Sequence, residues 1–137
     1  MAKYVFPAIF TPEENGAYSV RFPDVPGCYT SGESLPEAIE MAEDALCLLL
    51  YDMEESGEAL PIPSDISTVS KDSQEFVTLI ACDTLEYRKL YDNKAVKKTL
   101  SIPAWLNTMA EKQGVNFSQV LQTGLKQAIH IDENSPL

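Results

Sequence analysis

The stretch Val96-Lys97-Lys98-Thr99-Leu100-Ser101-Ile102-Pro103 decides how the C-terminal part of the chain is built. Its side chains alternate in polarity, which predicts a strand over residues 96–102 with Leu100 and Ile102 on one face. Pro103 ends the strand, because proline cannot continue a ladder, and begins a helix over residues 104–113. The opposite face of the strand is polar and carries Lys97, Thr99 and Ser101.

A second helix is predicted shortly after the first, which stops at Gly114. Asn116 can cap this second helix, with Gln119 at the capping-box position. Apolar residues then recur at helical spacing. They are Val120, Leu121, Leu125, Ala128 and Ile129.

This strand–helix–helix unit is incomplete as a single copy. One strand leaves its backbone groups without partners, and a unit of about 36 residues buries too little apolar surface to stand alone. Both problems disappear if two copies pair their strands antiparallel and pack their helices together. We therefore expect an obligate homodimer whose shared side contains Leu100, Ile102 and Trp105.

The paired strands would form a two-stranded ribbon of the width that fits the major groove of DNA. Free backbone amides at the start of the second helix can bind phosphate. Alternatively, Lys97, Thr99 and Ser101 form a solvated strand face, and Asn116 acts as a helix cap. The expected DNA-binding residues are Lys97, Thr99, Ser101, Asn116, Phe117 and Ser118.

The N-terminal part is predicted to contain a sheet and one long helix. Strands are expected over residues 4–10, 17–22, 28–32 and 76–82, the first two joined by a turn at Asn15-Gly16. The last strand is nearly all apolar, which favours an internal position in the sheet. Ser34 and Glu37 form a capping box for a helix of roughly 22 residues that stops at Gly57. Residues 85–91 form a short helix or a linker.

Charge divides the chain in two. Residues 1–93 carry five Lys and Arg against 18 Asp and Glu, whereas residues 94–131 carry five Lys against one Glu. The whole chain of 137 residues has a formal net charge of -11, which argues against nucleic-acid binding over its entire surface. We expect an acidic domain over 1–93 that suits a basic partner, a basic domain over 94–131, and a tail over 132–137.

Composition excludes several other classes of protein. No apolar run approaches the roughly 20 residues that span a bilayer, so we expect no membrane partner. The three cysteines are widely spaced and form no CxxC pair, which argues against a disulfide scaffold or a zinc knuckle. The expected location is the reducing cytoplasm.

Two segments resemble known families. Residues 97–103 followed by 114–121 resemble a ribbon-helix-helix domain of the Arc/MetJ class, whose dimers read DNA with the ribbon and usually repress transcription. Residues 21–34, Arg-Phe-Pro-Asp-Val-Pro-Gly-Cys-Tyr-Thr-Ser-Gly-Glu-Ser, followed by Glu37-Ala38, resemble the signature of HicB antitoxins. The resemblance implies an α+β fold with a partial RNase H-like N-terminal domain that binds a HicA toxin, a small basic ribonuclease. It also implies that the C-terminal domain binds the promoter of its own operon.

The surface that would face the toxin is less specified by the sequence. The segment from Pro23 to Gly27 is either a tight connection between strands or part of that surface, and the acidic face of the long helix is either solvated or a contact. The candidates are Phe22, Asp24, Tyr29, Glu40 and Asp44.

Enzymatic activity is not expected. RNase H chemistry needs several carboxylates that converge on two metal ions, and the first strand contains no acid. His130 has no Asp or Cys at ligand spacing, so neither a catalytic residue, a metal site nor a cofactor is predicted. Two alternatives stay open: an orphan ribbon-helix-helix regulator without a toxin, and a metal-dependent nuclease or hydrolase on the RNase H-like scaffold.

Overall fold

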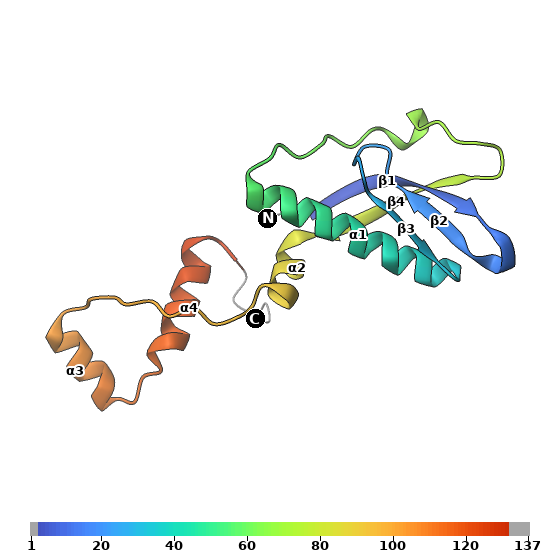
Figure 1. Cartoon of the computed structure of the whole chain (residues 1–137). Helices are drawn as coiled ribbons and strands as arrows, with labels where there is room; N and C mark the ends of the chain where they lie inside the picture. The colour runs from blue at the N-terminus through green and yellow to red at the C-terminus, as the bar shows by residue number, and fades with distance from the viewer. Residues whose placement is uncertain (1–2, 132–137) are drawn as a thin grey trace. The chain divides into compact units, whose positions relative to one another are not determined.

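The computed structural model describes residues 3–131, so the predicted tail over 132–137 lies outside the described residues. The chain divides into two compact units, Met1–Asp92 and Asn93–Leu137, called unit 1 and unit 2 below. Unit 1 contains a sheet and two α-helices, and unit 2 contains two further α-helices (Figure 1). The fold is α+β, as predicted.

The sheet of unit 1 has four strands in the order β3-β2-β1-β4, and each neighbouring pair is antiparallel. Their bounds are Lys3–Pro12 for β1, Tyr18–Arg21 for β2, Tyr29–Gly32 for β3 and Phe76–Asp83 for β4. The predicted internal position of the last strand is wrong, because β4 lies at an edge and β1 is internal. A run of apolar residues does not reveal whether a strand is central or at an edge of the sheet. In β4, Ile80 and Cys82 face the core, whereas Leu79 is 51% exposed.

The hairpin between β1 and β2 forms at the predicted turn. Asn15 and Gly16 both have left-handed backbone angles, with φ of 62° and 80°, inside a short 3-10 turn over Glu14–Gly16. Pairing with β2 starts only at Ile9, so the β2 side of β1 is open at Pro7. That open side accommodates the proline, which has no N–H to donate.

Helix α1, Leu35–Ser56, packs on one face of the sheet. Ser34 Oγ accepts from the Glu37 N–H at 3.3 Å, and the Glu37 carboxylate accepts from the Glu33 N–H at 3.0 Å. Gly57 ends the helix in a left-handed conformation, with φ of 74°. Both predicted helix ends are therefore confirmed. The helix buries Ala38, Ala42, Leu46 and Leu50.

These four side chains meet the inner face of the sheet to form the core of unit 1. The partners from the strands and from the loop after β2 are Phe6, Ala8, Phe10, Val20, Phe22, Val25, Cys28, Ile80 and Cys82. A 3-10 turn, η2 over Ile66–Thr68, lies in the loop between α1 and β4.

Helix α2, Thr84–Tyr91, closes unit 1 against α1. The Glu54 carboxylate of α1 accepts hydrogen bonds from Tyr4 Oη at 2.8 Å, Thr84 Oγ1 at 3.0 Å and Arg88 Nη2 at 3.0 Å. Arg88 also pairs with Glu55, and its guanidinium lies 4.6 Å from the centre of the Tyr51 ring. This network makes residues 84–91 a docked helix rather than a linker.

Unit 2 contains helices α3, Ala104–Lys112, and α4, Phe117–Ala128. Asn116 caps α4 as predicted, with its side-chain oxygen accepting from the Gln119 N–H at 3.1 Å. The predicted strand over residues 96–102 is not formed in the single chain. A lone extended segment has no ladder partner, so hydrogen-bonded strand structure there requires a second chain.

Candidate functional site

Unit 2 exposes apolar side chains that a stable fold would bury. Within residues 93–131 no side chain is buried. Leu100, Ile102 and Trp105, the predicted dimer contacts, are 58%, 47% and 65% exposed. The other large exposed apolar residues of this unit are Val96, Leu106, Met109, Phe117, Val120, Leu121, Leu125 and Ile129.

The predicted DNA-binding residues lie in two places in unit 2. Lys97, Thr99 and Ser101 are exposed in the segment before α3, and the single chain does not assemble them into a ribbon. Asn116, Phe117 and Ser118 lie together at the start of α4, where Asn116 caps the helix. The backbone amides of that first turn carry the positive end of the helix dipole.

Two of the predicted toxin contacts have structural roles within unit 1. Phe22 is only 3% exposed and belongs to the core, so the prediction that it faces the toxin is wrong. Side chains alternate along a strand, and the one that follows Arg21 points inward. Asp24 accepts from the backbone N–H of Ser64 at 2.9 Å and from its hydroxyl at 2.6 Å. Asp24 thus joins the loop after β2 to the loop after α1.

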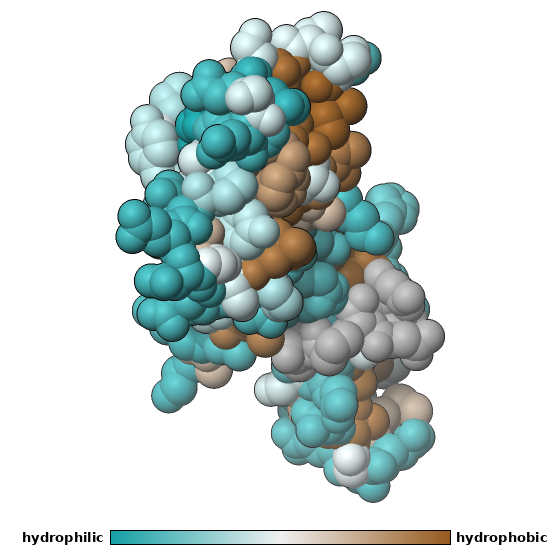
Figure 2. Space-filling model, turned by 90° about the vertical axis from the view of Figure 1, so that its right-hand side faces the viewer, coloured by the Kyte–Doolittle hydropathy of each residue, from teal (hydrophilic) through white to brown (hydrophobic). Residues whose placement is uncertain are grey.

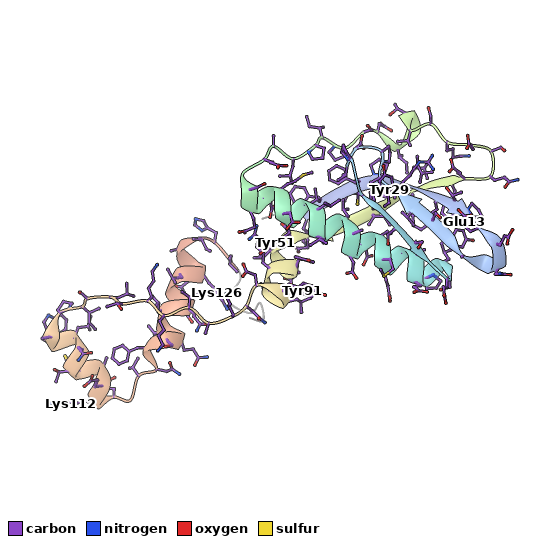
Figure 3. All side chains as sticks on the ribbon, in the orientation of Figure 1. Glu13, Tyr29, Tyr51, Tyr91, Lys112 and Lys126 are labelled. Carbon is purple, nitrogen blue, oxygen red and sulfur yellow. The ribbon has the colours of Figure 1, made fainter. Side chains whose placement is uncertain are left out.

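The other three candidates are exposed on two different elements. Tyr29 lies on β3 and is 72% exposed (Figure 3). Glu40 and Asp44 lie on the solvent side of α1, opposite the buried alanines and leucines. Helix α1 contains seven acidic residues and no Lys or Arg.

A groove lies on the other face of the sheet, away from the core. It has a volume of about 450 Å³ and is lined by Thr11, Ser19, Val20, Arg21, Tyr29, Thr30 and Ser31; we call it the β2–β3 groove. Most of these residues were not predicted as functional. Tyr29 is the exception, and Arg21 also had a sequence signal, because it is the only basic residue between Lys3 and Lys71.

Glu75, the residue that precedes β4, holds Arg21 in place. Arg21 Nη1 and Nη2 donate to the two Glu75 carboxylate oxygens at 2.7 and 3.1 Å, and Thr11 Oγ1 donates to Glu75 at 2.5 Å. These hydrogen bonds, that from Arg21 first, lower the pKa of Glu75 to about 2. A bidentate pair of this kind fixes the guanidinium in one orientation.

The described residues lack two kinds of feature. Residues 3–131 contain no group of three or more His, Cys, Asp and Glu side chains placed to hold a metal ion. In the same residues, no helix combines the length and the apolar character that crossing a membrane requires.

Proteins of similar sequence identify the family to which the chain is related. The profile of the HicB-like antitoxins of bacterial toxin–antitoxin systems matches residues 6–123. Antitoxin HicB 1 of Photorhabdus laumondii is 32% identical over 96 residues, which is 70% of this chain and 60% of that protein, so the chain spans less than two thirds of that relative.

Solved structures show the same fold. A toxin–antitoxin complex from Streptococcus pneumoniae contains a chain with 30% identity and a TM-score of 0.59, over 92% of this chain and 99% of that one. The antitoxin HicB of Burkholderia pseudomallei, at 20% identity, shares the fold with a TM-score of 0.53 over 91% and 98% of the two chains. Antitoxins are not enzymes, which confirms that part of the prediction. The chain belongs to the family of HicB-like antitoxins of bacterial toxin–antitoxin systems.

Proposed function

We propose that unit 1 binds and neutralises a small basic HicA-type ribonuclease, and that unit 2 represses the operon of the pair by binding its operator. The observation that carries this proposal is the division of charge between two structural units. Residues 1–92 hold 18 acidic and five basic residues, and residues 94–131 hold five Lys and one Glu. Each unit therefore suits a partner of the opposite charge.

The related chain in the Streptococcus pneumoniae complex supports the toxin half of the proposal, because its structure was solved as a toxin–antitoxin complex. Neutralisation needs no chemistry from unit 1, since covering the active site of a ribonuclease stops its activity. We place the pair in the cytoplasm, where the three free cysteines would stay reduced.

The DNA half of the proposal rests on dimerisation through unit 2. Within its described residues, 93–131, eleven large apolar side chains are exposed, among them Leu100, Ile102 and Trp105. A second copy would cover them and would pair residues 96–102 with their equivalents. The resulting ribbon-helix-helix would direct Lys97, Thr99 and Ser101 of both copies toward the bases, and the first turn of α4, with Asn116, Phe117 and Ser118, toward phosphates.

Separating the two units tests this division of labour. A chain truncated after residue 93 keeps the whole core of unit 1. We expect it to rescue growth of cells that express the toxin and to lose repression of a promoter reporter. Circular dichroism first establishes that the fragment is folded. A folded fragment that fails to rescue growth would refute the assignment of toxin binding to unit 1.

A further inference from the structure

We propose that the toxin docks on the β2–β3 groove with Tyr29 as the central contact, and that the acidic face of α1 only steers its approach. This inference rests on the proposed function and specifies which surface of unit 1 performs it. The occupant is one basic protein, the toxin, rather than nucleic acid, because unit 1 is strongly acidic.

The groove follows from the alternation of side chains along paired strands. Arg21 pairs with Tyr29 across β2 and β3, and Ser19 pairs with Ser31. All four therefore point to the same face of the sheet, while Val20 and Phe22 point into the core. The outer face of β2 and β3 is thus polar and carries one aromatic ring, that of Tyr29, which Figure 3 labels.

Hydrogen bonds within unit 1 orient the charged side chain of the groove, Arg21. Arg21 is fixed by both oxygens of Glu75, which is itself only 7% exposed, and Thr11 reinforces this pair. The positive charge of Arg21 is balanced by the Glu75 carboxylate, so Arg21 does not repel a basic partner. A preorganised surface loses little conformational entropy on binding, which favours affinity.

Tyr29 has the properties of an interface anchor. It is 72% exposed and contributes nothing to the core, although it sits on a strand hydrogen-bonded to its neighbour. Tyrosine is enriched among residues that carry most of the binding energy of interfaces, and its ring attracts Lys and Arg side chains. The hydroxyls of Ser19 and Ser31, on the same face of the sheet, can donate or accept hydrogen bonds.

The charge at the rim of the groove complements a basic partner. Glu13 accepts from Ser19 Oγ at 2.9 Å, which places a carboxylate beside the groove (Figure 3). On the face that Figure 2 displays, hydrophilic and hydrophobic residues lie side by side. A polar, hydroxyl-rich contact with one aromatic anchor fits such a surface.

The outer face of α1 differs from the groove in how its charged side chains are held. Glu40 and Asp44 are exposed and take part in no ion pair within the described part of the chain. Long-range attraction by unfixed surface charges raises the association rate, whereas desolvated, well-packed contacts slow dissociation. The two surfaces should therefore affect different rate constants.

The test uses the full-length chain and the small basic protein encoded beside it, with surface plasmon resonance at several salt concentrations. Tyr29→Ala should raise the dissociation rate at least tenfold and leave the salt dependence of association unchanged. Glu40→Gln combined with Asp44→Asn should lower the association rate at low salt by a few fold and leave dissociation unchanged. Tyr29→Phe keeps the ring and should bind within about threefold of the wild type.

Ser31→Arg provides a second, independent variant. Ser31 is exposed and lines the groove, so the arginine places a cation there that repels a basic partner and should also raise the dissociation rate. Thermal melts followed by circular dichroism establish that each variant is folded. Unchanged dissociation in both Tyr29→Ala and Ser31→Arg, or faster dissociation in the α1 variant instead, would overturn the assignment of the groove. Failure of the wild-type chain to bind the basic protein at all would instead refute the proposed function.

Discussion

Replacing Gly32 with alanine should open the contact between β3 and α1. A Cβ atom at Gly32 would lie 2.3 Å from the Ala38 amide nitrogen, 2.6 Å from the Ala38 Cα and 2.8 Å from the Glu37 carbonyl carbon. All three atoms belong to the backbone, which cannot rotate away as a side chain could. Nonbonded carbon atoms favour separations of about 3.5–4.0 Å, so the strand would have to move by roughly 1 Å or more.

Overpacking of this kind costs about 1–3 kcal/mol, and the smaller entropy of the unfolded alanine chain offsets only about 0.4–1 kcal/mol of it. We expect Gly32→Ala to lower the free energy of unfolding by about 2 kcal/mol, which for a unit of this size lowers Tm by roughly 8–16 °C.

Urea and thermal unfolding followed by far-UV circular dichroism measure this loss. Ser31→Ala is the matched control, because Ser31 is exposed on the same strand and should change stability by less than about 0.5 kcal/mol. A Gly32→Ala protein as stable as this control would show that the close approach of β3 to the first turn of α1 is not a constraint on the fold.

Three further outcomes are expected. Lys97→Ala should weaken operator binding and reduce the salt slope of log K by about two for the dimer, measured by gel shift over a salt series, while toxin binding stays unchanged. Leu100→Asp should place an unpaired charge in the shared core and convert the dimer to monomer in size-exclusion chromatography with light scattering; an unchanged oligomer would contradict the shared ribbon. Because the pKa of Glu75 is depressed to about 2, its pair with Arg21 stabilises unit 1 above its ordinary pKa near 4.5 and is lost as pH falls toward 2. Glu75→Gln should therefore flatten the pH dependence of Tm over that interval.

Local features of this protein could be predicted from the sequence because their causes are local. The cap at Ser34, the stop at Gly57 and the left-handed turn at Asn15-Gly16 each depend on the backbone preferences of a few adjacent residues. The charge division at residues 92–94 is also visible in the sequence. The apolar faces of unit 2 are visible as well, because alternation and helical spacing mark them.

Tertiary structure decided what depends on contacts between distant segments. Whether β4 lies inside the sheet or at its edge depends on which strand it pairs with, and an apolar run is compatible with both positions. The pairs Arg21–Glu75 and Asp24–Ser64 join residues 54 and 40 positions apart, and no spacing rule relates them. The register of β2 on β3 then gathers Ser19, Arg21, Tyr29 and Ser31 into one groove, because side-chain direction alternates strictly along paired strands.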